Sequence, residues 1–126
     1  MGHQVKVLDT SAMLAFFFGE PGGDKVLDAF GGGAISVVNV AEVLIRLARD
    51  GVDPTDSLAR VERCGLVVAP VTLDDAVEAA RLPANSGLSL GDRLCIALAA
   101  RLKAPVVTSD RMWSQLKLPV AVEQIR

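Results

Sequence analysis

The chain has 126 residues, of which 51 % are hydrophobic and 22 % charged, and it carries a formal net charge of −2. A chain of this length and apolar content can bury a core without a structural metal or disulfides, so we expect one domain that covers residues 1–126. The slightly acidic balance argues against the strongly basic surface that nonspecific nucleic-acid binding uses, although a carboxylate cluster that holds divalent cations reverses its own local charge.

The sequence shows no mark of a membrane or exported protein. The longest apolar stretches, near residues 15 and 94, are shorter than the roughly 18–20 residues that a bilayer-spanning helix needs. No charged region, long apolar region and cleavage site precede the first predicted strand, so we expect a cytoplasmic protein. Cys64 and Cys95 form no CxxC pair, and we expect both to be free thiols that behave as small buried hydrophobes.

Short apolar runs alternate with helical patterns along the chain. In the first half the pattern predicts, in order, a strand at 5–8, helices at 12–18 and 24–30, a strand at 34–38, and a helix that Asn39 caps and that continues to Arg49. In the second half it predicts a helix at 54–64, a strand at 66–71, a helix at 74–81, a helix that Ser89 caps and that ends near Leu102, a strand at 106–108, a helix at 111–116 and a last strand at 120–122. Strands separated by helices imply βαβ units, a mainly parallel sheet and a three-layer α/β/α sandwich.

Four acidic residues fall where a predicted strand ends or a predicted helix begins. Asp9 ends the first strand, Glu42 lies in the first turn of the helix after the second strand, Asp92 opens the long helix, and Asp110 follows the fourth strand. In open α/β sheets, ligands bind outside the carboxyl ends of the strands, where the strand order reverses. All four carboxylates can therefore lie at one edge of the sheet.

Such a cluster suits a specific chemistry. Mg²⁺ and Mn²⁺ prefer oxygen ligands and bind through a few carboxylates together with substrate phosphate. Two such ions can activate a water and stabilise the leaving oxygen when a phosphodiester is hydrolysed, and no histidine or nucleophilic serine is then required. The one histidine, His3, precedes the first strand, where we expect a loosely held terminal residue rather than a general base.

Each acid also has a purely structural explanation. Asp9 and Asp110 could cap the helices that follow them, and the segments 39–42 and 89–92 resemble capping boxes. Glu42 could instead pair with Arg46, one turn further along the helix. Spacing alone leaves the capping and the metal-binding interpretations both open.

Four segments resemble the successive signatures of PIN-domain nucleases, and most closely those of VapC-type toxins: VLDTSAML, SVVNVAEVLIRL, LSLGDRLCIALA and VVTSDRMW. They cover nearly the whole chain in the right order and spacing. The resemblance implies an endoribonuclease, with RNA as substrate and Mg²⁺ or Mn²⁺ as cofactor. It also implies a homodimer and a cognate antitoxin that blocks the groove.

The resemblance further assigns site residues by position. It makes Asp9, Glu42 and Asp92 the central acids that hold metal, with Asp110 as the fourth, which often supports a second ion. Ser11 and Thr108 match neighbouring hydroxyl positions, which could orient an acid or a metal-bound water or could serve only the local backbone.

Several other side chains have two interpretations each. Arg46, Arg93 and Arg111 could surround the pocket and meet phosphates, or could be solvated helix charges. Trp113 could stack on a base, although its helical spacing with Leu116 favours a place in the core.

Three consecutive phenylalanines, Phe16, Phe17 and Phe18, point about 100° apart around a helix, so at least one should face away from the sheet. We predict a dimer or antitoxin contact there.

Three other classes of protein share parts of this pattern. Haloacid-dehalogenase-like phosphatases need a second aspartate two residues after the first, where this chain has Ser11. Phosphoreceiver domains need paired acids after the first strand, an aspartate after the third and a later lysine, and the chain does not place these residues so. A catalytically silent PIN-like module that binds RNA or protein remains open, because its fold and acids could be the same.

Overall fold

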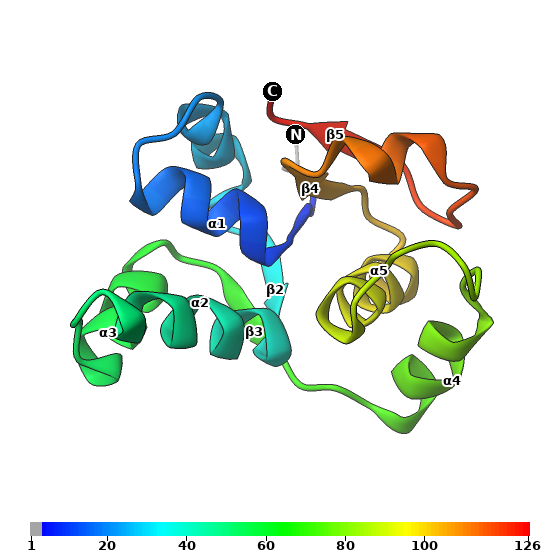
Figure 1. Cartoon of the computed structure of the whole chain (residues 1–126), viewed down its shortest axis with the longest axis horizontal. Coiled ribbons are helices and arrows are strands. Elements are labelled where there is room, and N and C mark those ends of the chain that lie inside the picture. Colours follow the sequence, from blue (N-terminus) through cyan, green and yellow to red (C-terminus); the bar gives the residue numbers. More distant parts are fainter. Residues whose placement is uncertain (1–3) are drawn as a thin grey trace.

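The computed structural model of the protein describes residues 4–126 (Figure 1), so the prediction for His3 lies outside the described residues. The strands are β1 (Val7–Leu8), β2 (Ala34–Ser36), β3 (Val67–Ala69), β4 (Val106–Thr108) and β5 (Val122–Gln124). The α-helices are α1 (Thr10–Phe17), α2 (Val37–Arg49), α3 (Pro54–Arg63), α4 (Leu73–Arg81) and α5 (Leu90–Leu102). Two 3₁₀ helices complete the set, η1 (Gly23–Ala29) and η2 (Arg111–Gln115).

The strands form one five-stranded sheet in the order β3-β2-β1-β4-β5, and every neighbouring pair is parallel. In Figure 1 the helices α1, α2 and α3 lie on one side of this sheet and α4 and α5 on the other. The predicted three-layer α/β/α sandwich with a mainly parallel sheet is thereby confirmed. The chain runs outward from β1 to β3 and then returns to the other side of β1 with β4, so the strand order reverses between β1 and β4.

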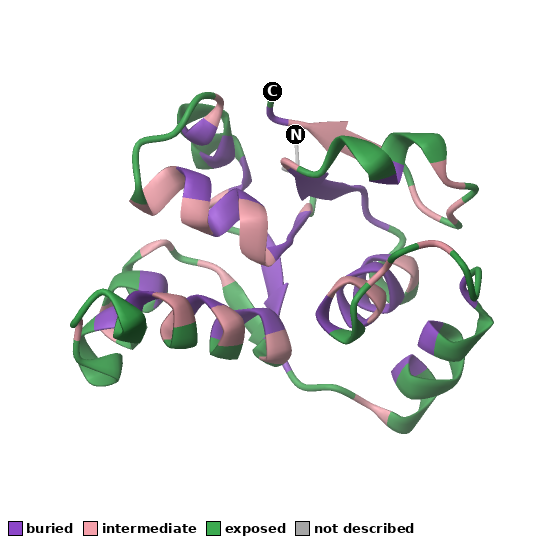
Figure 2. Ribbon diagram, in the orientation of Figure 1, coloured by how far each residue is buried: buried purple, intermediate pink, exposed green. Residues whose placement is uncertain are grey.

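The core consists of two layers because successive strand residues point to opposite faces of a sheet. On β1 and β4, Leu8 and Val107 face the cluster under α1, α2 and η1, whereas Val7 and Val106 face the cluster under α5. Figure 2 shows β1, β2 and β4 in the colour of buried residues, whereas β3 is largely exposed and β5 intermediate. Trp113 is 1 % exposed and packs in the second cluster, so the core interpretation of this residue is correct and base stacking is excluded.

The beginning of α2 differs from the prediction. Strand β2 ends at Ser36 rather than at Val38, and the Ser36 hydroxyl caps α2 by accepting a hydrogen bond from the Val38 N–H at 3.2 Å. The β-branched pair after Ser36 therefore forms the first helical turn instead of prolonging the strand. Asn39 is thus not a cap, and Glu42 lies in the second turn of the helix instead of the first.

The remaining elements follow the predictions with small shifts. Helix α5 and strand β4 have the predicted bounds, and Ser89 caps α5 in a capping box with Asp92. Residues 23–29 form a 3₁₀ helix rather than an α-helix, and β5 begins at Val122, two residues later than predicted.

Neither cysteine in the described residues forms a disulfide. Cys95 is fully buried among core residues of α5, and burial raises the pKa of its thiol well above the ordinary value. Cys64 is partly exposed at the end of α3, so the expectation of a buried hydrophobe holds fully only for Cys95. None of the helices in residues 4–126 is both long and apolar enough to cross a membrane.

Candidate metal centre

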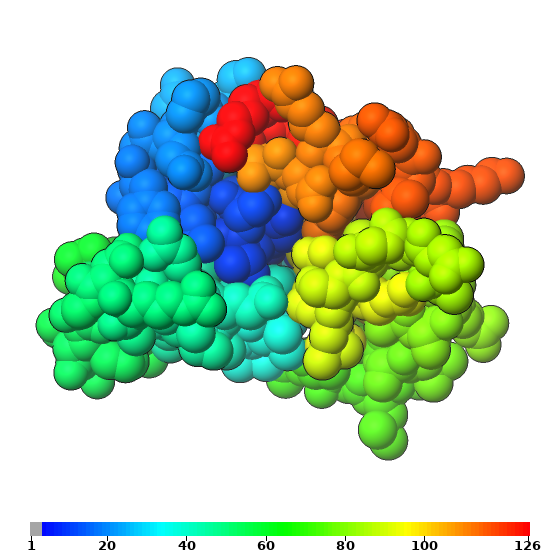
Figure 3. All heavy atoms as spheres, in the orientation of Figure 1, coloured from blue at the N-terminus to red at the C-terminus, as the bar shows by residue number. Residues whose placement is uncertain are grey.

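The four predicted acids come from segments that reach the same edge of the sheet. Asp9 directly follows β1, and Asp110 follows β4 after Ser109. Helices in βαβ units run opposite to the strands, so the helix starts that carry Glu42 and Asp92 lie at the edge where the strands end. In Figure 3 atoms from the beginning of α1, from α2, from the beginning of α5 and from the segment after β4 border one another at the middle of the visible face.

Asp9 is held by three neutral donors. It is the N-cap of α1, where Oδ1 accepts the Ala12 N–H at 2.8 Å. The Ser11 hydroxyl lies 2.8 and 2.9 Å from the two carboxylate oxygens, and the Thr108 hydroxyl donates to Oδ2 at 2.6 Å. The two predicted supporting hydroxyls therefore both contact Asp9, and they link the first helix to the end of β4.

The carboxyl of Asp9 is 3 % exposed and has no cationic partner within residues 4–126. Burial raises its pKa from 3.8 to about 6, against the lowering effect of the hydrogen bonds from Thr108, Ala12 and Ser11. The negative charge of Asp92 raises this pKa further. The ionised form is therefore poorly stabilised by the chain itself.

Glu42 projects from α2 onto the start of α5. Its Oε1 accepts hydrogen bonds from the Thr10 hydroxyl at 2.5 Å and from the Asn39 side-chain amide at 3.0 Å. Its carboxylate also packs directly against the backbone of Gly91. Sequence reasoning missed these three neighbours, although Asn39 stands three residues before Glu42, a spacing that places two side chains on one helix face.

Asp92 and Asp110 both serve as helix caps in addition to facing the other acids. Asp92 accepts the Ser89 N–H at 3.0 Å, and Asp110 accepts the Met112 N–H at 2.9 Å. Burial raises the pKa of Asp92 while both hydrogen bonds with Ser89 lower it, and the charges of Asp110 and Glu42 raise it. The charge of Asp92 also raises the pKa of Asp9, so Asp92 interacts electrostatically with all three of the other acids.

The donor chemistry of this cluster fits a hard divalent cation, but three of the four acids are turned to capping hydrogen bonds at their own helices. None of the four acids forms an ion pair with another residue in 4–126, so their mutual repulsion is uncompensated. In the same part of the chain, no group of three or more His, Cys, Asp or Glu side chains is placed to hold one ion. The capping interpretation is therefore correct for Asp9, Asp92 and Asp110, and it leaves the carboxylates with unused acceptor capacity.

Comparison with known proteins identifies the family. The model of the PIN domain matches residues 6–118. The chain belongs to the PIN-domain family. Comparison with curated proteins gives no significant match.

Solved structures agree with this assignment. A toxin–antitoxin complex from Klebsiella pneumoniae superposes with a TM-score of 0.76 at 18 % identity, over 96 % of this chain and 98 % of that chain. DNA-bound VapBC from Salmonella typhimurium gives 0.73 at 19 % identity, over 98 % and 99 %. VapBC-5 from Mycobacterium tuberculosis is 30 % identical, with a TM-score of 0.58 over 97 % and 98 % of the two chains.

Arg93 of this PIN domain does not surround the site as one interpretation had it. Its guanidinium donates to the backbone carbonyls of Ala79, Leu82 and Pro83 at 3.0, 3.2 and 2.8 Å. These carbonyls lie at the end of α4, where the last helical acceptors lack partners within the helix. Arg93 therefore fastens α4 to α5, and its charge is not free to meet a phosphate.

Arg46 is also engaged away from the acids. It pairs with Asp50 at 2.9 Å, and its guanidinium lies 5.0 Å from the centre of the Phe18 ring. The alternative in which Arg46 pairs with Glu42 is therefore not the one that the structure shows. Arg111 is exposed beside Asp110 and forms no ion pair with another residue in the described range, so it stays available to a phosphate.

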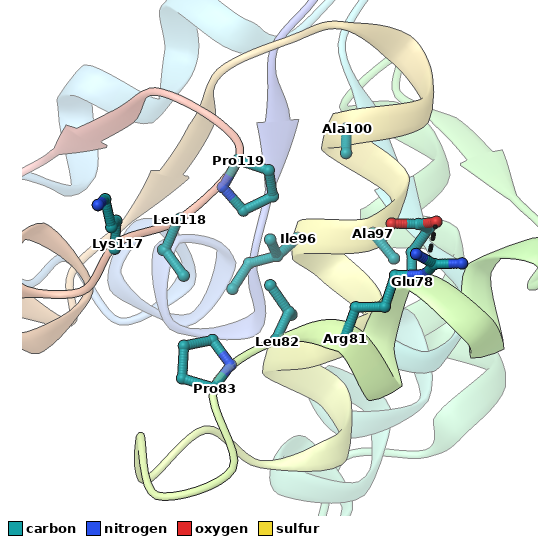
Figure 4. A pocket seen from close by; sticks show the side chains of 10 residues that line it. All are labelled: Glu78, Arg81, Leu82, Pro83, Ile96, Ala97, Ala100, Lys117, Leu118 and Pro119. Carbon is teal, nitrogen blue, oxygen red and sulfur yellow. Dashed lines mark ion pairs between the residues drawn. The ribbon is translucent and has the colours of Figure 1, made fainter.

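A separate hollow of this PIN domain, about 480 Å³ in volume, lies between α4, α5 and the segment 117–119 (Figure 4). Leu82, Ile96 and Leu118 are among the apolar residues that line it, and the ion pair of Glu78 with Arg81 lies at its margin. None of the four acids lines this hollow. It is thus distinct from the candidate metal centre.

Proposed function

We propose that this chain is the toxin of a VapBC-type toxin–antitoxin pair and acts as an endoribonuclease that needs Mg²⁺ or Mn²⁺. The observation that carries the proposal is the group of acids Asp9, Glu42, Asp92 and Asp110 at one sheet edge, none of which forms an ion pair with another residue in 4–126. Membership of the PIN-domain family and similarity to toxin–antitoxin structures support the same function.

In this proposal Asp9, Glu42 and Asp92 hold the cation and Asp110 supports a second one. Bound divalent ions would supply an activated water and stabilise the leaving oxygen of the phosphodiester. The side chains of this protein have simpler tasks. Ser11 and Thr108 hold both oxygens of Asp9 in place. Because Asp9 is buried, a bound cation would stabilise its ionised form.

The partner in this proposal is a cognate antitoxin in the cytoplasm, and the toxin itself is a homodimer. An exposed apolar surface on α1, η1 and α2 suits a protein partner, because Phe18, Leu27 and Ile45 are 41 %, 52 % and 59 % exposed. Of the three consecutive phenylalanines, at least one of which was expected to face away from the sheet, Phe18 is the exposed one. A groove of about 370 Å³ is lined by the other two phenylalanines, Phe16 and Phe17, together with Leu27 and other residues.

The decisive test is cleavage of a panel of RNAs by the purified protein in Mg²⁺ or Mn²⁺, compared with Asp9→Asn and Asp92→Asn. We expect cleavage by the parent protein, its loss on chelation, and its loss in both variants while they remain folded by circular dichroism. The amide is isosteric with the carboxylate, so it removes charge and keeps shape. Cleavage that survives both substitutions and chelation overturns the mechanism.

A catalytically silent PIN-like module that binds RNA or protein is the second candidate. What favours it is that Asp9, Asp92 and Asp110 already serve as caps, so the acids have a use without metal. Retention of RNA by the purified protein, with no cleavage in either metal and no binding of the metals themselves, would select this candidate.

A further inference from the structure

Asn39, in the first turn of α2, is an unusual residue for an almost fully buried position. It is 1 % exposed, and its Oδ1 has no hydrogen-bond partner among the described residues. Its Nδ2 donates to Glu42 Oε1 at 3.0 Å, to Thr10 Oγ1 at 3.1 Å and to the Gly91 carbonyl at 3.3 Å. A carboxylate and a carbonyl can only accept, so these partners fix which way the amide points.

The hydrogen bonds to Glu42 are one-sided. The hydroxyl of Thr10 and the amide of Asn39 both donate to Oε1, and Oε2 receives no hydrogen bond from residues 4–126. Two donors on one oxygen fix the plane of the carboxylate and leave the other oxygen without a donor. This is the arrangement of a metal-ligating carboxylate that other side chains orient.

Gly91 is the third residue that contacts the Glu42 carboxylate, after Thr10 and Asn39. A Cβ atom at this position would collide with both oxygens and the Cδ of Glu42. Any residue larger than glycine would therefore displace the carboxylate. Glycine is disfavoured inside helices relative to alanine. Its presence in the first turn of α5, directly before Asp92, allows the Glu42 carboxylate to approach the α5 backbone closely.

We propose that Thr10, Asn39 and Gly91 are positioning residues that fix the Glu42 carboxylate for a divalent cation, by holding Oε1 and leaving Oε2 open. This inference rests on the proposed metal-dependent function. It also explains why a buried asparagine with an unpartnered oxygen is present where a hydrophobic residue would pack as well. The group joins α1, α2 and α5, which are far apart in the sequence.

The sharpest test is Gly91→Ala, because a structural and a positioning role predict opposite results. Alanine favours the helix, and half-buried Glu42 can turn toward solvent, so the melting temperature without metal should not fall. The dissociation constant for Mn²⁺, measured by calorimetry, should rise at least about 10-fold. Adding the shorter Glu42→Asp should relieve the collision, so the loss in the double variant should be smaller than the sum of the two single losses.

Two further pairs of variants test the donors. Thr10→Val should weaken Mn²⁺ binding about 10-fold and Thr10→Ser should not, because only serine retains the hydroxyl. Asn39→Ala should weaken it similarly. Ser57→Ala removes a fully buried hydroxyl without a hydrogen-bond partner on α3, a helix that carries none of the four acids, and should leave Mn²⁺ binding unchanged.

The outcomes separate this inference from the function on which it rests. Mn²⁺ binding by the parent protein that disappears in Asp92→Asn supports the metal centre, and unchanged binding in Gly91→Ala and Thr10→Val then overturns the positioning role alone. A parent protein that binds no Mn²⁺ overturns both. If Asn39→Ala does not fold, Gly91→Ala and Thr10→Val still decide.

Discussion

Two buried aspartates of this protein occupy similar places and have opposite electrostatics. Asp9 and Asp75 are each 3 % exposed, and each accepts a backbone N–H at the start of a helix. Asp75 also receives the guanidinium of Arg101, whose Nε and Nη2 lie 3.0 and 3.1 Å from its two oxygens. The further donors to Asp9 are the neutral hydroxyls of Ser11 and Thr108.

The pKa values of the two carboxyls move apart for this reason. At Asp75 burial raises the pKa, but the hydrogen bonds and charge of Arg101, with the hydrogen bonds from Thr72, outweigh burial and leave the pKa below its ordinary value. At Asp9 burial prevails and the pKa is about 6. Where the fold uses an acid to fasten α4 to α5, the chain supplies the cation, whereas at the sheet edge no side chain of residues 4–126 forms an ion pair with Asp9.

The largest expected difference between the two aspartates is in RNA cleavage. Asp9→Asn should lower cleavage at least about 100-fold, the upper range for losing a residue that merely orients a metal ligand. Asp75→Asn should leave cleavage per folded molecule unchanged, because Asp75 touches none of the four acids. Rates measured at a temperature where both variants are folded check this, and equal losses would show that the two aspartates do not differ in function.

The next effect is on stability as a function of pH without metal. A folded-state pKa above the ordinary 3.8 means that the proton stabilises the fold, so this contribution is complete below pH 3.8 and is lost as the pH rises to about 6. The free energy of unfolding of the parent should therefore fall by up to about 3 kcal/mol over this window relative to Asp9→Asn. Denaturant titrations at several pH values measure it, and parallel pH profiles would contradict the assignment.

A smaller effect is expected when the ion pair at Asp75 is broken. Arg101→Met keeps an apolar stem but removes the guanidinium, and it leaves a buried carboxylate without its cation. Unfolding should therefore need about 2 kcal/mol less, a value reduced from that of fully buried pairs because Arg101 is partly exposed. The loss should shrink as the pH falls below the ordinary pKa of an aspartate, because Asp75 then becomes neutral. Arg81→Met, at the exposed pair with Glu78, is the matched control and should change stability little.

Asp110 should give the smallest effect on stability. It is exposed and caps η2, and asparagine caps helices as well as aspartate does, so Asp110→Asn should change the free energy of unfolding by less than about 0.5 kcal/mol. The same variant should raise the Mg²⁺ concentration needed for half-maximal cleavage. A variant that cleaves with the same Mg²⁺ requirement as the parent would remove Asp110 from the metal centre.

The fold was predictable where local signals agree. Ser89 with Asp92 forms the capping box that the spacing indicates, and a β-branched run gives β4 its bounds. The start of α2 was missed because Val37 and Val38 favour a strand, and the hydroxyl of Ser36 decides for a helix. Local propensity could not separate these two alternatives.

The site was predictable only in part. The four acids lie where strand ends and helix starts put them, but spacing does not reveal whether side chains converge on an ion or turn to their own caps. Arg93 could not be placed from the sequence, because its partners are backbone carbonyls of another helix. The role of Gly91 could not be predicted from the sequence either, because it depends on the side chain of Glu42, 49 positions away on α2.

The hydrogen bond from Thr108 to Asp9 joins residues 99 positions apart, and the central strand β1 pairs with β4 only after residue 106 exists. During synthesis Asp9 is therefore made long before Thr108, the most distant of the residues that orient it. A nuclease that depends on this orientation of Asp9 acquires it only when β4, the last strand but one, has been added.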